Sequence, residues 1–431
     1  MTRPTRAWRT AVVLATASLA LTACGSDSTT EDPASEDSSS SAPSSSAPAA
    51  KGDGTLTIGT LLPQTGDLAF LGPPEFAGVE AALNDINAAG GVLGKDAVQV
   101  KADSGDGTPD IAGAQTDKLL DANADVVLGA ASSSVSLSVI DKITGAGVVH
   151  FSPANTSTVL DDPKTDPKNL YFRTAPSDVL QGAVLSNLII EDGKNNVAIL
   201  ARQDSYGEAL ARETEKGIKS GGGNVVSKQL YSADATNFTA EVNKVAASKP
   251  DAIVLISFDE TKKLIPQLIA KNVGPQDVQT YFVDGNTADY ADDFPKGTLK
   301  GVKATYPGAE LTADFKSVMV KTDPKLKEFT YGPESYDATM LSALAAIEAK
   351  TDDPTTFAPN IITVSAGGTE CSTFKDCAAL LQKGEDIDYQ GVSGPCDLGE
   401  TGSPTKATIG IFQYEAGGAF PKSLNFVTGV I

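Results

Sequence analysis

The sequence predicts an α/β protein in which helices cover both faces of parallel β-sheets. From residue 55 onward, short runs rich in β-branched residues alternate with segments whose apolar residues recur every three or four positions. Repeated strand–helix units of this kind form parallel sheets, because each helix returns the chain to the same edge of the sheet. Residues 55–431 are also long for one hydrophobic core, so we expect two domains.

The first half of the folded part contains the first series of these units. Strands are expected at residues 55–62 and 97–103 and at the starts of residues 126–136 and 148–156, and residues 171–174 lead out of this series. A helix is expected at residues 74–87, and Gly90 with Gly91 ends it in the usual C-terminal manner. Thr108 and Pro109 start the next helix, because Thr is a good N-cap and Pro suits the first helical position.

The second half repeats the alternation. Strands are expected at residues 197–200, 225–230, 253–256 and 280–283, with helices between them, and residues 302–306 precede another helical stretch. Residues 334–350 form the longest helical pattern late in the chain. Both halves therefore predict the same type of layered α/β domain.

Two hydroxyl-rich loops follow neighbouring expected strands. Residues 126–136 (VVLGAASSSVS) and 148–156 (VVHFSPANT) each begin as a buried strand and then break into small and hydroxyl residues. The first loop enters a helix through Ser132, Ser133 and Ser134, so free N–H groups and a positive dipole end gather with the hydroxyls. The pair indicates a site for a small anion such as a carboxylate. The alternative is that Ser and Thr simply cap helices here.

Other polar or aromatic residues also come just after expected strands. These segments are residues 64–66, 204–207, 257–259 and 284–286. In open α/β sheets, ligands bind beyond the carboxyl ends of the strands. Together with the two hydroxyl-rich loops, these segments predict a ligand cleft between the facing edges of two domains.

The residues that catalysis needs are scarce. The chain has one histidine, His150, and it lies within an expected strand, where packing is its simplest role. No Ser-His-Asp set, G-x-S-x-G motif or zinc spacing is present, and glycine-rich residues 90–94 follow a helix instead of opening one. The paired carboxylates at residues 161–162 and 292–293 are expected to be solvated. We therefore expect no enzyme activity, no cofactor and no metal site.

The chain is acidic overall. Its formal charge is −21, from 34 Lys and Arg against 55 Asp and Glu. Nucleic acids and anionic lipids both attract clustered Lys or Arg, so neither is an expected partner. We expect a monomer.

The first residues form an export signal. A basic start and a short apolar stretch run into residues 21–24 (LTAC), which resemble the lipobox of bacterial lipoproteins. That resemblance implies a signal peptide at residues 1–23 and lipid on Cys24, the mature N-terminus, on the outer side of the cell membrane. An ordinary secretory signal is the alternative. Residues 24–54 are mostly Ser, Ala, Pro and acidic residues, so we expect a disordered tether.

Three cysteines remain beyond Cys24. Cys371 and Cys377 are close enough in sequence to form a disulfide in an exported protein. Cys396 is then left over, either buried or free.

Residues 56–94 resemble the N-terminal signature of the branched-chain amino-acid binding proteins of ABC transporters. Residues 132–134, 152–156, 206–208 and 336–338 extend the resemblance in the same order. It implies a periplasmic-binding fold of type I, with two Rossmann-like lobes joined by a hinge of three crossovers. The first lobe comprises residues 55–174 and 306–389, and the second comprises residues 175–305 and 390–431. The implied function is to capture a small aliphatic amino acid and deliver it to an ABC permease.

The resemblance also assigns roles to individual residues. Ser133 and Thr156 bind the ligand carboxylate, and the Ala154 carbonyl accepts from the ammonium group. Tyr206 covers the ligand from the second lobe, and Asp284 pairs with the ammonium group. For Asp284, capping of the turn with Gly285 is the alternative.

The remaining assignments mark departures from the family pattern. Phe258 falls near a position that is aromatic in the family. Leu71 stands where the family has an aromatic lid, with Phe70 adjacent, and Asn155 places an amide where small residues are common. A binder of amides, urea-like solutes or aromatic carboxylates is therefore a second interpretation, and a ligand-sensing module is a third.

Overall fold

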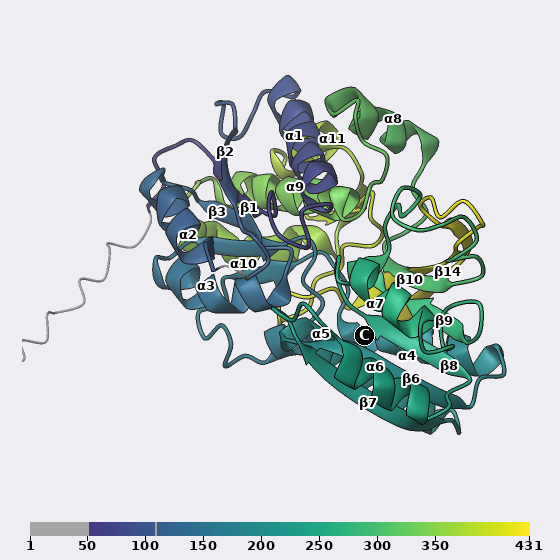
Figure 1. The fold of residues 1–431 in the computed structure, drawn as a ribbon. Helices are drawn as coiled ribbons and strands as arrows, with labels where there is room; N and C mark the ends of the chain where they lie inside the picture. Colours follow the sequence, from purple (N-terminus) through teal and green to yellow (C-terminus); the bar gives the residue numbers. More distant parts are fainter. Residues whose placement is uncertain (1–50, 108–109) are drawn as a thin grey trace, which may run out of the picture. The chain divides into compact units, whose positions relative to one another are not determined.

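The computed structural model describes residues 51–107 and 110–431 (Figure 1). The predicted signal peptide at residues 1–23, Cys24, most of the tether at residues 24–54 and the predicted helix start at residues 108–109 lie outside the described residues.

The first sheet is parallel and has five strands. Their order is β2 (Val98–Asp103), β1 (Thr57–Leu62), β3 (Val126–Gly129), β4 (Val149–Ser152) and β5 (Tyr171–Arg173). Alternate residues of a strand point to opposite faces. Val126 and Leu128 accordingly join the core under one face, whereas Val127 joins the core under the other.

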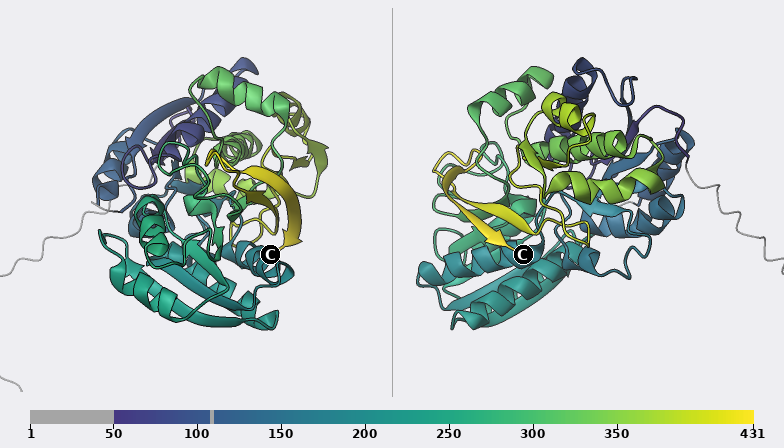
Figure 2. Two further views of the ribbon diagram at one scale, coloured as in Figure 1. Left: turned by 45° about the vertical axis from the view of Figure 1, so that its right-hand side comes forward. Right: turned by 180° about the vertical axis from the view of Figure 1, so that it is seen from behind.

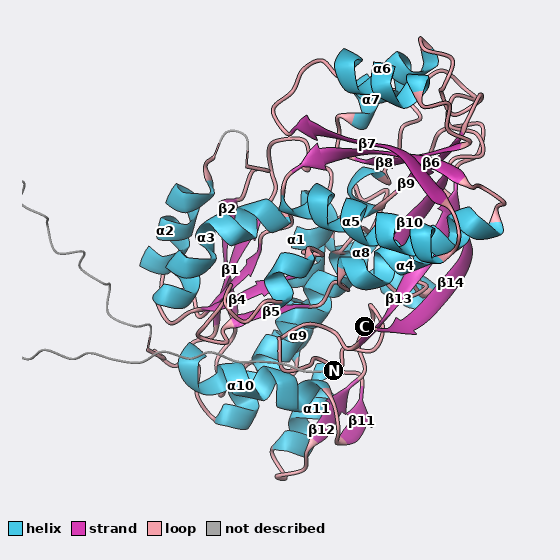
Figure 3. Cartoon of the chain, turned by 90° about the horizontal axis from the view of Figure 1, so that it is seen from below, coloured by secondary structure: helices cyan, strands magenta, loops and turns pink. Residues whose placement is uncertain are grey.

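Helices from distant parts of the chain cover this sheet. Helices α1 (Gly72–Ala88), α9 (Gly332–Ala349), α10 (Pro354–Ser365) and α11 (Phe374–Leu381) share the core of one face. Helices α2 (Ala112–Asp121) and α3 (Ser133–Gly145) cover the other. Figure 3 shows the strands of both sheets between helices.

The second sheet has seven strands. Their order is β14 (Lys422–Val430), β13 (Lys406–Gln413), β10 (Lys303–Pro307), β9 (Gln279–Phe282), β8 (Ala252–Ile256), β6 (Asn196–Gln203) and β7 (Asn224–Ser232). Helices α4 (Asp178–Glu191) and α5 (Ser205–Ser220) cover one face, and α6 (Thr239–Ala247) and α7 (Thr261–Ile269) cover the other. The predicted α/β fold with two parallel-rich sheets is confirmed.

The sequence analysis missed the antiparallel end of the second sheet. Strand β13 pairs antiparallel with both β10 and β14, and Figure 2 shows this hairpin in yellow at the edge of the sheet. The cause is composition, since β14 is an edge strand that is mostly exposed and has no buried apolar run to mark it. A short parallel pair, β11 (Thr369–Cys371) with β12 (Ile387–Tyr389), was also missed, because three residues are too few to show a period.

Within the described part of the chain, the backbone passes between the two sheets three times. The passages follow β5, β10 and β12. The second passage leads through α8 (Ala313–Thr322) to α9. The lobe boundaries at residues 174/175, 305/306 and 389/390 lie at or near these passages and stay a prediction.

A disulfide joins Cys371 of β11 to Cys377 of α11, with 5.4 Å between the two Cα atoms, as expected. Cys396 is both buried and free of a disulfide. None of the helices in residues 51–107 and 110–431 is long and apolar enough to cross a membrane.

Candidate functional site

The two hydroxyl-rich loops meet at the end of the first sheet. Ser132 is the N-cap of α3, and Ser133 is its first residue. The Ser133 hydroxyl oxygen accepts from the backbone N–H groups of Thr156 and Ser157, at 3.3 Å each. The loop after β4 is therefore drawn to the helix N-terminus, where free N–H groups and the positive dipole end lie.

Asn155 explains one departure from the family pattern. Its Nδ2 donates to the carbonyl oxygens of Ala130 at 2.9 Å and Ala131 at 3.0 Å. Its Oδ1 accepts from the Tyr171 hydroxyl at 3.0 Å. The amide thus ties the loop after β4 to the loop after β3, a role that a small residue cannot fill.

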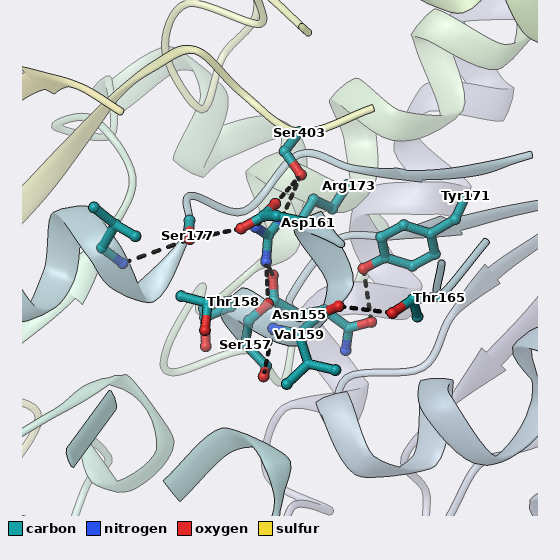
Figure 4. A network of polar contacts seen from close by, with 12 residues as sticks. Asn155, Ser157, Thr158, Val159, Asp161, Thr165, Tyr171, Arg173, Ser177 and Ser403 are labelled. Atoms are coloured by element: carbon teal, nitrogen blue, oxygen red, sulfur yellow. Dashed lines mark hydrogen bonds and ion pairs between the residues drawn. The ribbon is translucent and has the colours of Figure 1, made fainter. Parts of the chain in front are cut away.

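A fully buried arginine supports the same loop from behind. Arg173, the last residue of β5, donates from Nη1 to the carbonyl oxygens of Asn155 at 3.2 Å and Ser157 at 3.1 Å (Figure 4). Its Nη2 pairs with Asp161, and its Nε donates to the Ser403 hydroxyl at 2.9 Å. Arg173 therefore fixes the backbone on both sides of Thr156.

The prediction that Asp161 is solvated was wrong. Asp161 ends the short helix η1 (Thr158–Asp161), and besides pairing with Arg173 it accepts from the hydroxyls of Ser177 at 3.0 Å and Ser403 at 2.7 Å. Ser403 lies 230 residues beyond Arg173, so neighbouring residues gave no sign of the network. The network joins the first sheet to two of the three passages between the sheets.

On the opposite side of the site, Asp284 is the central residue. It opens the short helix η2 (Asp284–Asn286) just after β9 and is 3% exposed. Its Oδ1 accepts from the Tyr206 hydroxyl at 2.6 Å and from Gln181 Nε2 at 2.9 Å, and its Oδ2 accepts from the Tyr331 hydroxyl at 2.7 Å. Burial, together with the charge of Asp284, raises the pKa of both tyrosines, so both remain donors.

Aromatic rings flank this carboxylate. Tyr206 stacks on Phe258, with ring centroids 5.4 Å apart and planes inclined by 20°. The Arg202 guanidinium lies 3.6 Å from the Phe258 centroid and pairs with Asp204 and Glu260, at 2.6 Å each. Phe258 is therefore held between a ring and a planar cation.

The two sides enclose one small cavity. Its volume is about 20 Å³, and its lining residues are Leu68, Leu71, Ala131, Ser132, Ser133, Ala154, Tyr206, Phe258, Asp284, Gly285 and Tyr331. Across the cleft, the hydroxyls of Ser134 and Ser205 lie 3.2 Å apart, and the Ser157 hydroxyl donates to the Ser205 carbonyl at 2.8 Å. The two sides of the site are therefore in contact, and the cleft is closed.

The structure brings most of the predicted site residues to this cavity. Six of the predicted residues line it directly: Leu71, Ser133, Ala154, Tyr206, Phe258 and Asp284. Thr156 lies just behind the lining, fully buried, with its N–H on Ser133. The alternative role for Asp284 is to cap its own turn. Its carboxylate oxygens instead accept from three side chains of other elements.

Sequence reasoning missed Tyr331 and Gln181. Tyr331 precedes α9 with a φ of 57°, in the left-handed region, and Gln181 lies within α4. Neither follows a strand, which was the signal used to find the others. The Gly332-Pro333 pair after Tyr331 does mark a helix start, and that was the available clue.

Several buried polar atoms remain unsatisfied near the cavity. The Ser132 hydroxyl oxygen forms no hydrogen bond with the described residues, and the Thr156 hydroxyl and the Asp178 carboxyl group have no partner among them besides each other. Burial, and then the charge of Asp284, raises the pKa of Asp178, which favours its neutral, proton-donating form. Since a buried polar group without a partner costs about 1–3 kcal/mol, these atoms suit contact with a polar ligand.

His150 is packed, as expected. It is fully buried within β4, with its ring 5.3 Å from that of Tyr171. Burial lowers the pKa of His150 to about 4, so it stays neutral at neutral pH.

The chain belongs to the periplasmic binding protein family, whose model matches residues 55–419. This is a class of extracytoplasmic solute-binding proteins associated with ABC transporters, and its members are not enzymes. The expectation that the protein is not an enzyme is therefore confirmed.

Two amino-acid-binding proteins are similar to this chain over most of its length. The Leu/Ile/Val/Thr-binding protein of Salmonella typhimurium is 26% identical over 363 residues, which cover 82% of this chain and 90% of that protein. The leucine-specific-binding protein of the same organism is 27% identical, over 82% of this chain and 89% of that protein.

Solved structures share the fold. The branched-chain amino acid transporter substrate-binding protein of Streptococcus pneumoniae, in complex with isoleucine, has a TM-score of 0.70 at 22% identity and covers 88% of this chain and 100% of its own. A solute-binding protein of R. palustris, in complex with benzoate, has a TM-score of 0.68 at 18% identity and covers 88% and 98%.

Proposed function

We propose that the protein captures an aliphatic amino acid between its two sides and delivers it to an ABC permease. One observation carries the proposal. A buried carboxylate, Asp284, lies on one side of the cavity, and hydroxyls at the N-terminus of α3 lie on the other. A zwitterion has the matching pair of opposite charges.

The first side suits the ligand carboxylate. Hydroxyl groups of Ser132, Ser133 and Thr156 and the α3 N-terminus supply neutral donors and a positive dipole end. The Ala154 carbonyl, in the same loop, then accepts from the neighbouring ammonium group.

The second side suits the ammonium group. An ammonium group enclosed without a partner is costly, and Asp284 supplies the charge that offsets this cost. The hydroxyls of Tyr206 and Tyr331 and the amide of Gln181 fix the orientation of that carboxylate. Leu68, Leu71 and the rings of the second side leave apolar surface for an aliphatic side chain.

Capture requires the two sides to move apart. A volume of about 20 Å³ admits roughly one water molecule, so an amino acid needs more room than this arrangement gives. Opening breaks the contacts of Ser205 with Ser134 and Ser157, and closure on the ligand restores them. A ligand that touches both sides favours the closed arrangement, because only that arrangement makes both sets of contacts.

The same proposal includes the location. Cys24 is the lipidated mature N-terminus, and the segment up to residue 54 tethers the folded part to the outer face of the membrane. Cys24→Ala is expected to give an unprocessed or released protein. Membrane fractionation that finds a normally cleaved, fully membrane-bound variant would contradict the anchor.

A binder of aromatic carboxylates is the second candidate. The stacked Tyr206 and Phe258 and the neutral form of Asp178 favour it, as does the likeness to a benzoate-binding structure. Such a ligand has no ammonium group, so Asp284 would face no opposite charge.

Calorimetric titration of the full chain separates the candidates. Leucine, 4-methylpentanoate (leucine without its amino group) and benzoate are each titrated under the same conditions. Leucine is expected to bind most tightly, and at about 100 times its Kd to stabilise the fold by about 2.7 kcal/mol. Benzoate binding without leucine binding would overturn the amino-acid proposal in favour of the second candidate.

A further inference from the structure

A second and larger cavity lies beside the passages between the sheets. Its volume is about 450 Å³, and we call it the hinge pocket. The end of β10, the segment before α9 and the β13–β14 hairpin form its walls. Its lining includes four aromatic and two acidic residues: Tyr306, Phe329, Phe412, Phe420, Glu328 and Glu334.

Aromatic rings form one wall of the hinge pocket. The ring centroids of Tyr306 and Phe412 are 5.3 Å apart, and Phe420 lies 5.9 Å from Tyr306 and 6.1 Å from Phe412. These rings are only partly buried although they cluster. A partly exposed aromatic cluster around a cavity is typical of a ligand site, because core rings are fully covered.

Two carboxyl groups lie deeper in the pocket. Glu334 is 2% exposed, and its Oε1 lies 2.8 Å from where a side chain on Gly308 would begin. Gly308 has a φ of 110°, a backbone conformation that favours glycine. The lack of a side chain at this position also leaves room for the Glu334 carboxyl group. Glu328 Oε2 is buried and forms no hydrogen bond within residues 51–107 and 110–431.

The basic residues of the pocket lie at its rim. Lys316, Lys327 and Lys422 are exposed, and Lys422 pairs with Glu415 at 2.9 Å. The ionisable groups at the pocket floor are therefore the carboxyl groups of Glu328 and Glu334. Burial raises the pKa of Glu334 to about 8 and that of Glu328 to about 7, which reflects the lack of compensating positive charge around them.

We propose that the hinge pocket binds a small organic cation with an aromatic or branched apolar body. The faces of Tyr306, Phe412 and Phe420 attract a cation electrostatically. The carboxylates of Glu328 and Glu334 complement its charge, and the cation in turn favours their ionised form. The volume of about 450 Å³ suits a molecule of this size.

The hinge pocket and the candidate solute site share two pieces of chain. In the segment before α9, Glu328 and Phe329 line the hinge pocket, whereas Tyr331 donates to Asp284. In β10, Tyr306 lines the hinge pocket, whereas the Thr305 hydroxyl accepts from Gln181 at 3.3 Å. Occupation of one site thus changes the packing of residues that hold Asp284, and the two sites are coupled.

This coupling rests on the proposed function, whereas cation binding does not. If an amine in the hinge pocket changes the affinity for leucine by some factor, leucine changes the affinity for the amine by the same factor. We expect a factor of about five or more.

The test titrates the full chain with three probes of similar shape and measures their binding by calorimetry. The probes are benzylamine, benzyl alcohol and benzoate. Benzylamine is expected to bind. Glu334→Gln, which keeps the shape of the side chain, weakens its binding by about tenfold or more. Glu348→Gln, on the same helix but outside the pocket, leaves it within about twofold. Phe420→Ala, which acts on the wall instead of the floor, also weakens it.

Other outcomes overturn the proposal. If the alcohol or benzoate shows the same Glu334-dependent binding as the amine, the pocket does not select a cation. If benzylamine binding is lost in Asp284→Asn and kept in Glu334→Gln, the amine occupies the solute site instead. Unchanged leucine affinity at saturating benzylamine would refute the coupling. Absence of leucine binding, with the amine result intact, would refute the proposed function alone.

Discussion

The two sides of the solute site hold their ligand groups in different ways. The first side offers hydroxyls, backbone N–H groups and a helix N-terminus, so it recognises charge with neutral groups. The second side offers the Asp284 carboxyl group and aromatic side chains. A site built from backbone depends on what holds that backbone, whereas a site built from side chains depends on the side chains themselves.

The supporting residues follow this division. Arg173 holds the first side through backbone carbonyls and touches no lining side chain in a direct hydrogen bond among the described residues. On the second side, Tyr206, Tyr331 and Gln181 donate directly to the Asp284 carboxylate. Substitutions should therefore change fold stability on the first side and ligand selectivity on the second.

The largest expected effect concerns Arg173. Arg173→Met removes four donated contacts and leaves Asp161 without its cation, so the free energy of unfolding should fall by about 3 kcal/mol. Urea denaturation monitored by circular dichroism measures the loss. Arg212→Met is the matched control, because exposed Arg212 donates to Thr158 and Glu213 alone among the residues that the structure describes. It should cost less than about 1 kcal/mol. Equal losses of unfolding free energy for the two substitutions would contradict the supporting role of Arg173.

A smaller effect is expected at Tyr206. Tyr206→Phe keeps the ring on Phe258 and removes one hydroxyl donor from Asp284. Leucine affinity should fall by about 1.5–2 kcal/mol, the lower part of the usual range of about 1.5–3 kcal/mol for a hydrogen bond to a charged group. The affinity for 4-methylpentanoate should change less, because that ligand has no ammonium group for Asp284. Calorimetry with both ligands checks this, and equal losses would mean that Tyr206 acts on the fold instead of on Asp284.

The third prediction contrasts Asp284 with a carboxyl group that lacks such donors. Burial raises the pKa of Glu334 to about 8 from 4.5, and the charge of nearby Asp337 acts in the same direction. The folded state therefore keeps a proton that the unfolded state loses above about pH 4.5, so stability falls as pH rises from about 5 to 8.

Glu334→Gln removes this dependence. Relative to the variant, the wild type should lose about 1 kcal/mol of unfolding free energy per pH unit in that window. Denaturation curves at several pH values measure the difference, with Glu348→Gln as the control that keeps the wild-type slope. Parallel curves for the wild type and Glu334→Gln would show that this carboxyl is not held neutral.

Strand ends made much of the fold and of the site predictable from sequence. Ser133, Ala154 and Asp284 each follow a buried apolar run, and parallel strands bring such ends to one edge. Tyr331 and Gln181 could not be found this way, since they reach Asp284 across 47 and 103 residues. Strand β14 gave no signal either, because an exposed edge strand has no buried apolar period to mark it.

The supporting network was the least predictable part. Asp161 sits in a turn-like sequence and was expected to be solvated, yet it pairs with an arginine that is fully buried. Burial of Arg173 depends on Ser403 and Ser177, which only the folded chain brings near. Local sequence describes the groups that face a ligand better than the groups that hold them.

Titration of leucine into Asp284→Asn by calorimetry tests the central claim most directly. Asparagine keeps the shape of the side chain and removes its charge, so a ligand ammonium group loses its partner across the cleft. The amino-acid proposal predicts that leucine affinity falls by about 2–5 kcal/mol, while the affinity for 4-methylpentanoate falls by much less. Unchanged leucine affinity in Asp284→Asn would contradict the proposal, because it would remove Asp284 from the ammonium site.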